Sequence, residues 1–279
     1  MINLVVALPA EARPLIDCYQ LNKKTTIGTF RVHQHADMSL IISGPGKVAA
    51  AAATALLASR NSPGKQAAWL NIGIAGHATY STGQSLLAHR ITDYATGKSW
   101  YPPQLFDLPT TTGSLLTVDV PENNYHQDLA YDMEASGYYP VASRFSSMEL
   151  VQCFKVVSDN REQSTATVTA KSCAQLVTRK LDEIDTLVRA LASLTQEVNH
   201  WRAPPAGLER LTVQWHFTVS QQHQLAELAR RWQVLMPEQP LWLSELEKQK
   251  NATAVLQSLR QHLDSLAPGL IQKAHSPRV

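Results

Sequence analysis

The sequence predicts a layered α/β fold with a mixed central sheet covered by helices, followed by a mostly helical appendage. Mainly apolar runs at residues 2–8, 67–72 and 150–157 are typical of short strands that are buried on both faces. The alanine-rich segment 47–59 lies between two of these runs and favours a helix. Strands that alternate with helices indicate a sheet flanked on both faces.

The first 60 residues follow this alternation closely. Pro9 ends the first apolar run, and residues 11–19 can then form a helix. Residues 29–35 and 38–43 are predicted strands. The second of them leads into the turn Gly44-Pro45-Gly46, which precedes the alanine-rich helix.

The middle of the chain continues with strands. The run at residues 67–72 is expected to end in a glycine turn, Gly73-Ile74-Ala75-Gly76. Further strands are predicted at residues 83–93 and 115–118, and a loop rich in proline and threonine separates them at residues 100–113. The last strand, at residues 150–157, runs into Ser158-Asp159.

The pattern changes after residue 169. From Ala170 to Val198, apolar residues recur at spacings of four and three, which predicts one long helix with a continuous apolar stripe. We therefore expect a first domain at residues 1–175 and an appendage at residues 176–279.

The appendage continues beyond a proline-containing linker at residues 203–207. Residues 211–219 alternate between apolar and polar, which predicts one strand. Two helices are expected after it, at residues 220–236 and 243–266.

A strand and a stripe of this kind favour a homodimer. The strand at residues 211–219 cannot pair its own backbone groups and needs a partner strand. The apolar stripe from Ala170 to Val198 must be buried against another helix. The alternative is that the two later helices cover the stripe within one chain.

The composition narrows the class of protein. The chain has 279 residues, 44% of them hydrophobic, with 25 basic and 23 acidic side chains. It lacks the basic excess of a nucleic-acid-binding protein, so no nucleic-acid partner is expected. The N-terminus does not read as a signal peptide, and no apolar run is long enough to span a membrane, so we expect a cytoplasmic location. Three separated cysteines are expected to be reduced and buried.

Two carboxylates, Glu134 and Asp159, stand where apolar runs meet polar residues. Glu134 lies in Tyr131-Asp132-Met133-Glu134-Ala135, and Asp159 lies in the run from Lys155 to Asn160. Together with residues 2–11 and 43–48, these segments resemble the nucleoside phosphorylase and nucleosidase superfamily. The pattern is most similar to the 5′-methylthioadenosine/S-adenosylhomocysteine nucleosidases. The resemblance covers residues 1–175, and it implies the phosphorylase/hydrolase-like layered fold and a nucleoside substrate without metal or organic cofactor.

The resemblance implies a role for each of three carboxyl groups. Asp159 matches the family aspartate that protonates the leaving purine, a form that burial favours. Without the resemblance, the alternative interpretation of Asp159 is a helix N-cap. Glu134 matches the glutamate that binds the ribose hydroxyls. Glu11 matches the glutamate that holds the attacking water, although a glutamate in a first helical turn commonly serves only the helix dipole.

Further residues follow from the same resemblance. Met133 would line the ribose face, although an isolated methionine is more often a core residue. The two glycine turns resemble the loops that border the family's pocket, which assigns substrate contacts to Gly44, Ile74 and Gly76. Ser158 joins them from the Ser-Asp strand end.

Three features depart from the family pattern. Ile74 replaces a small or hydroxylated residue at the water site. His77 takes the place of a glycine, and it either restores polarity there or points to solvent. The segment between Gly83 and Asp132 is short and omits most of the part that supplies the aromatic residue stacking on the purine. Trp100 or Tyr101 could substitute for that residue.

Other residue groups have simpler interpretations. His33 and His35 share a strand face at a spacing that suits a metal, but no third ligand follows, so two structural histidines are favoured. Arg13 and Arg90 are expected on the solvated surface. Purine nucleoside hydrolysis is the predicted function. Phosphate-dependent phosphorolysis and nucleoside binding without turnover remain the alternatives.

Overall fold

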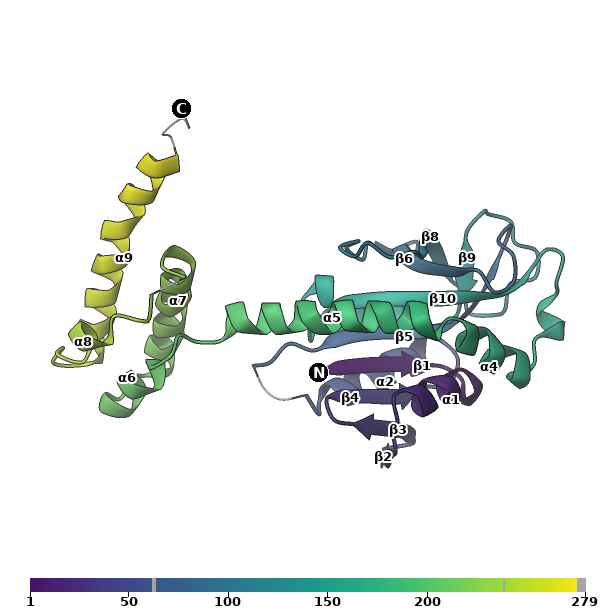
Figure 1. The fold of residues 1–279 in the computed structure, drawn as a ribbon, viewed down its shortest axis with the longest axis horizontal. Helices are drawn as coiled ribbons and strands as arrows, with labels where there is room; N and C mark the ends of the chain where they lie inside the picture. Colours follow the sequence, from purple (N-terminus) through teal and green to yellow (C-terminus); the bar gives the residue numbers. More distant parts are fainter. Residues whose placement is uncertain (62–63, 238, 275–279) are drawn as a thin grey trace. The chain divides into compact units, whose positions relative to one another are not determined.

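A computed structural model describes residues 1–61, 64–237 and 239–274 of the protein. The chain divides into two compact units, Met1–Glu197 and Val198–Val279 (Figure 1). The first unit reaches 22 residues beyond the expected boundary at residue 175. It does so because the helices after that residue pack into its core.

One mixed sheet forms the centre of the first unit. Its strands follow the order β10-β6-β8-β9-β5-β1-β4-β3-β2, with β7 beside β6, and β10 also pairs with β5. Strand β5 is parallel to β1 and β10 but antiparallel to β9, which confirms the mixed sheet. The strands are β1 (Ile2–Val6), β2 (Lys23–Ile27), β3 (Phe30–His35), β4 (Met38–Ile42), β5 (Ala68–His77), β6 (Ser85–Asp93), β7 (Ser99–Trp100), β8 (Thr111–Thr117), β9 (Ala130–Asp132) and β10 (Val151–Asn160).

Helices cover both faces of this sheet. They are α1 (Pro9–Cys18), α2 (Lys47–Ala58), α3 (Ala135–Ala142), α4 (Ala170–Arg179) and α5 (Leu181–Arg202). Within β1, Leu4 packs into a core with α1, α4 and α5, whereas its neighbour Val5 packs into a second core with α2 and α3. Because successive residues of a strand face opposite ways, a strand between two cores is apolar throughout. This explains the continuous apolar runs.

The long helix expected at residues 170–198 is two helices. Thr169 caps α4, which ends at Arg179, and α5 begins at Leu181. Glu183 anchors the new helix, because it accepts hydrogen bonds from Ser85 and Thr110 and pairs with Lys180. The apolar stripe is not open, since its central residues are buried against the sheet of the same chain: Val177, Ile184, Val188 and Leu191. One of the two premises for a homodimer is therefore wrong.

The glycine run in β5 is not a turn. The strand continues through Gly73 and Gly76 to His77. Both glycines allow a close approach instead: a Cβ on Gly73 would lie 3.0 Å from Oε1 of Glu11, and a Cβ on Gly76 would lie 2.7 Å from the ring of Tyr125. The glycines were therefore correctly predicted to lie at an unusual backbone position, but that position is a strand with close side-chain contacts and not a turn.

The described residues of the second unit form helices joined by turns and loops. Its helices are α6 (Leu208–Gln214), α7 (Val219–Leu235), α8 (Leu243–Leu246) and α9 (Ala252–Ala274). The predicted helix at 220–236 is confirmed as α7, whereas the one at 243–266 is divided into α8 and α9. Arg230 and Arg231 flank a core stripe on α7, in which Leu225, Leu228, Ala229 and Trp232 are buried.

The strand predicted at residues 211–219 is wrong. Leu208, Leu211 and Trp215 also follow a spacing of three and four, and this helical period places them on the core side of α6. Thr218 then caps α7 by accepting a hydrogen bond from the Gln221 backbone. The second premise for a homodimer is therefore also wrong.

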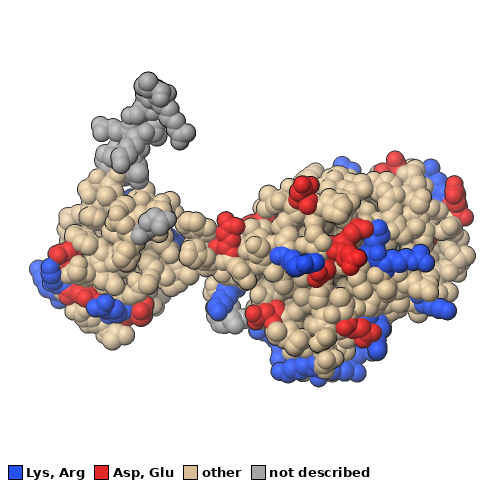
Figure 2. Space-filling model, in the orientation of Figure 1, with Lys and Arg blue, Asp and Glu red and all other residues tan. Residues whose placement is uncertain are grey.

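One of the three cysteines is exposed at the surface. Cys153 and Cys173 are buried free thiols, but Cys18 is exposed, contrary to the expectation. Basic and acidic side chains are interspersed on the face shown in Figure 2. Among the described helices, none is both long and apolar enough to cross a membrane.

Candidate active site

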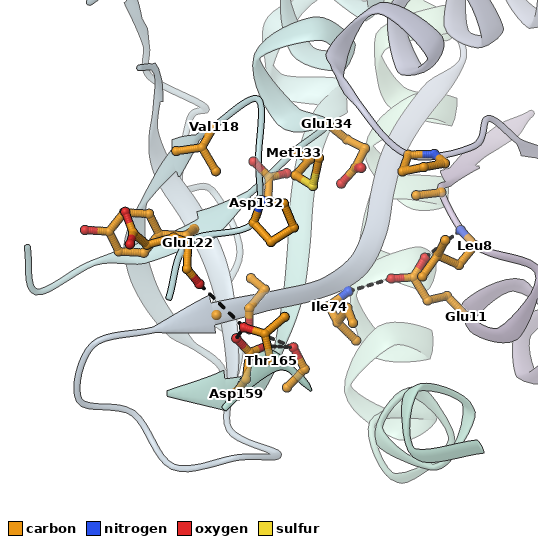
Figure 3. Close-up of a pocket in the computed structure, with 17 residues that line it drawn as sticks. Leu8, Glu11, Ile74, Val118, Glu122, Asp132, Met133, Glu134, Asp159 and Thr165 are labelled. Atoms are coloured by element: carbon orange, nitrogen blue, oxygen red, sulfur yellow. Dashed lines mark hydrogen bonds between the residues drawn. The ribbon is translucent and has the colours of Figure 1, made fainter. Parts of the chain in front are cut away.

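A cavity of about 160 Å³ lies where β1, β5, β9 and β10 come together. Figure 3 shows Glu11 and Glu122 at opposite ends of its lining. Its carboxyl side chains come from elements that are far apart in the sequence. The lining comprises Ala7, Leu8, Glu11, Pro45, Ile74, Ala75, Gly76, Val118, Pro121, Glu122, Tyr131, Asp132, Met133, Glu134, Ser158, Asp159 and Thr165.

Glu11 is held rigidly by two backbone groups. It lies in the first turn of α1, directly after β1, and only 2% of it is exposed. Its Oε1 accepts a hydrogen bond of 2.9 Å from the Ile74 N–H, and its Oε2 accepts one of 2.8 Å from the Leu8 N–H. Burial raises the pKa of Glu11 to about 7, although these hydrogen bonds act in the opposite direction. Glu11 therefore changes charge near neutral pH, as a general base should.

Glu134 is fixed at the start of α3. Its Oε1 accepts a hydrogen bond of 2.9 Å from the N–H of Gly46. Gly46 has φ +97°, a conformation that favours glycine, and this turns its N–H toward the carboxylate. Burial raises the pKa of Glu134, while the ammonium of Lys155 opposes that shift.

Lys155 is a buried cation behind the cavity. Its side chain is 1% exposed, and its Nζ lies 2.9 Å from Oδ2 of Asp132 and 3.9 Å from Oε2 of Glu134. Burial alone would lower the pKa of Lys155, but these two carboxylates outweigh it and raise the pKa above its usual value. The lysine is therefore charged and compensates the two carboxylates.

Asp132 completes this ionic group. Its Oδ1 accepts a hydrogen bond of 2.7 Å from Thr117, and its Oδ2 accepts one of 2.9 Å from the Ala135 N–H. Its position is therefore set by β8, by α3 and by Lys155 together.

Asp159 stands at the end of β10, surrounded by hydroxyl groups. The hydroxyls of Tyr125 and Thr165 donate to Oδ2, and the hydroxyl of Ser158 bonds to Oδ1. Asp159 does not cap an α-helix, because the next one begins eleven residues later and is capped by Thr169. A buried carboxyl group at a cavity wall is a candidate proton donor.

Solved structures with a similar fold include nucleosidases and a futalosine hydrolase. The 5′-methylthioadenosine/S-adenosylhomocysteine nucleosidase of Campylobacter jejuni gives a TM-score of 0.54 at 13% identity, covering 66% of this chain and 96% of that chain. The corresponding nucleosidase of Colwellia psychrerythraea, in complex with adenine, gives 0.50 at 20% identity, with coverages of 65% and 94%. Futalosine hydrolase of Helicobacter pylori gives 0.52 at 14% identity, with coverages of 65% and 97%. No protein-family model and no curated protein matches the sequence.

The chain has the nucleosidase fold. The similarity extends over about 65% of its length, and this confirms the fold that the sequence resemblance implied. At identities of 12–20%, the comparison shows the fold alone.

Within this nucleosidase fold, most of the residues expected at the site line the cavity. These are Glu11, Ile74, Gly76, Met133, Glu134, Ser158 and Asp159. Gly44 lies outside the lining, and the neighbouring Gly46 makes the contact with Glu134. The exposed Arg13 pairs with Asp17, and Arg90 is also exposed.

Two expectations about the surroundings are wrong. His77 neither faces the water site nor points to solvent: it is buried and stacks on Tyr80, and its Nδ1 accepts hydrogen bonds from two backbone N–H groups. Trp100 and Tyr101 do not line the cavity. The aromatic side chain that does so is Tyr131.

The sequence interpretation missed four residues around the site: Lys155, Asp132, Tyr125 and Thr165. Lys155 left a visible signal, because a lysine inside an apolar strand is rarely buried unless it is paired. The others left none that could be recognised from spacing alone. The contact of Tyr125 with Asp159 depends on how the loop between β8 and β9 approaches the end of β10.

Proposed function

We propose that the protein hydrolyses the N-glycosidic bond of a purine nucleoside of the 5′-modified adenosine type. The carrying observation is that Glu11, Glu134 and Asp159 converge on one cavity although each is held by a different element. The nucleosidase fold supports the same reaction class.

Each carboxyl group has a separate task in this reaction. Asp159 gives a proton to N7 of the purine as the bond between C1′ and N9 breaks. Glu134 accepts hydrogen bonds from the ribose hydroxyls and stabilises the positive charge that develops on the sugar. Glu11 orients a water molecule and takes its proton as the oxygen bonds to C1′. The products are the free base and the free sugar.

Phosphorolysis fits the cavity less well. Among the described residues that line it, none is lysine or arginine, whereas five are acidic: Glu11, Glu122, Asp132, Glu134 and Asp159. The nearby Lys155 is already paired with Asp132. Such a lining repels a phosphate ion, so water is the favoured nucleophile.

Nucleoside binding without turnover is the second candidate. It is favoured by the aliphatic side chain of Ile74, whose backbone N–H contacts Glu11 at the water end of the cavity. The side chain of Ile74 itself offers no polar group to a water there.

One assay separates these functions. The pure protein is incubated with a panel of purine nucleosides, with and without phosphate, and free base and sugar are measured. We expect base release in phosphate-free buffer with free or 5′-modified ribose as the second product. Strict dependence on phosphate, with ribose 1-phosphate formed, would identify a phosphorylase. Binding without any base release would identify the second candidate.

The pH dependence of the reaction should follow Glu11. Because its carboxyl group has a pKa of about 7 and must be ionised to accept a proton, kcat/KM should fall as the pH drops below about 7. Between pH 7 and pH 5 we expect a decrease of about tenfold per pH unit, measured with a saturable nucleoside substrate. A profile that is flat from pH 5 to pH 8 would exclude Glu11 as the base.

We also propose a cytoplasmic homodimer that takes small nucleosides, without nucleic-acid or membrane partners. The dimer now rests on the superfamily resemblance alone, because both structural premises for it are wrong.

A further inference from the structure

Both oxygens of Asp159 are already occupied by hydroxyl groups of the chain. Ser158 and Thr165, two of the three donors, are one and six residues away from Asp159 and stay beside it. Tyr125, the third, is 34 residues away, on the loop between β8 and β9. Only this donor can leave by a movement of that loop.

Tyr125 fills the space beside the part of the cavity that Asp159 and Gly76 line. The residue is 1% exposed, and its ring and hydroxyl both lie 2.7 Å from the position that a Cβ on Gly76 would take. Its ring also meets the edge of Tyr131 at a centroid distance of 5.6 Å. Gly76, Tyr131 and Asp159 all line the cavity, so the tyrosine occupies volume that adjoins it.

The remaining cavity is small for the proposed substrate. Its volume is about 160 Å³, whereas pockets for ligands of drug size usually have about 300–1,000 Å³. A purine nucleoside therefore needs additional space, and the side chain of Tyr125 occupies the adjoining volume.

The loop holds Tyr125 in an unfavourable backbone conformation. Its φ is +47°, in the left-handed region that a tyrosine rarely adopts. The guanidinium of Arg161 donates a hydrogen bond of 2.5 Å to its carbonyl oxygen, and Lys47 pairs with Asp119 at the start of the same loop. Burial raises the pKa of Tyr125, so the hydroxyl stays neutral and remains a donor.

On the basis of the proposed function, we infer that Tyr125 occupies the base subsite of the empty enzyme and that an incoming purine displaces it, together with its loop, to reach Asp159. Tyr125 is then a specificity-determining residue. A ligand enters only if its own hydrogen bonds to Asp159 replace the one that the tyrosine gives up.

Adenine binding to the full-length protein tests this inference, because the free base samples the base subsite alone. Removing the hydroxyl in Tyr125→Phe weakens the closed state, and a larger competent fraction gives a lower apparent Kd. We expect calorimetry to show adenine binding several-fold to about tenfold tighter than in the wild type, the size expected for the loss of one typical hydrogen bond from the closed state. The melting temperature of the ligand-free variant should be lower.

Tyr139→Phe is the matched control. Tyr139 is also buried, and its hydroxyl has no hydrogen-bond partner among the described residues. This variant should bind adenine like the wild type. A second measurement needs no variant: adenine should increase hydrogen–deuterium exchange of the loop amides at residues 118–129 in the wild type.

Each outcome decides between the proposals. Adenine affinity that is unchanged or weaker in Tyr125→Phe, or loop exchange unchanged by adenine, overturns the displacement of Tyr125 and leaves the proposed hydrolysis standing. Tighter binding without hydrolysis of any nucleoside supports the displacement and overturns the hydrolysis. If neither protein binds adenine, both proposals are wrong.

Discussion

Asp159→Asn should lower kcat by about 10²–10⁴, the usual contribution of a general acid. Asparagine keeps the size of the side chain but has no acidic proton to give to the purine. Its carbonyl oxygen can still accept from Tyr125 and Thr165, and its amide can donate to the hydroxyl of Ser158, which can act as acceptor. The fold and the affinity for the nucleoside, within about tenfold, should therefore be preserved.

Single-turnover kinetics with a saturating nucleoside measures this effect on the chemical step. Asp107→Asn is a suitable control, because Asp107 is exposed and the exchange of aspartate for asparagine is the same. The control should retain the wild-type rate. If Asp159→Asn also turns over at nearly that rate, another group protonates the base and the assignment of Asp159 fails.

The parts of the fold that lie between two cores were predictable from the sequence. Strands β1, β5 and β10 are buried on both faces, and burial of this kind leaves a mainly apolar run. Helix α2 was equally clear, because alanine has the highest helix propensity.

Other elements carry sequence signals that conflict with their structure. Strand β2 is a polar edge strand, so it lacks an apolar pattern. Helix α3 has only eight residues and contains both Gly137 and Pro140, which are poor helix formers. Residues 211–219 fit the period of a strand and also contain helical spacings, and only packing in the second unit decides between them.

Some residues of the candidate site could also be predicted from the sequence, and others could not. Asp159 was located because it stands at the end of a strand that the sequence reveals, whereas Glu134 was located by the motif that resembles the superfamily, since β9 before it has only three residues. Tyr125 could not be located, since its contact with Asp159 joins residues 34 positions apart through an irregular loop. Lys155 could have been, because a charge within an apolar strand requires a partner.

Lys155→Met should destabilise the protein by about 3–5 kcal/mol near neutral pH, because it leaves buried carboxylates without their cation. Asp132 lies 2.9 Å from the ammonium and Glu134 3.9 Å from it, and both carboxylates are buried. The fit of a methionine into the same space does not offset the uncompensated charge. Urea denaturation monitored by circular dichroism measures the loss.

The dependence on pH and on Asp132 distinguishes this cause from poor packing. Without the cation, the folded-state pKa of a buried carboxyl group rises above its unfolded value, so stability is retained at low pH and lost as the pH rises through that range. The loss should therefore be smaller at pH 5 than at pH 8. The second substitution, Asp132→Asn, removes one of the two carboxylate charges while its amide can still bond to Thr117 and to the Ala135 N–H. The double variant should consequently be more stable than Lys155→Met alone. If the two substitutions instead add up at both pH values, Lys155 contributes packing and not charge compensation.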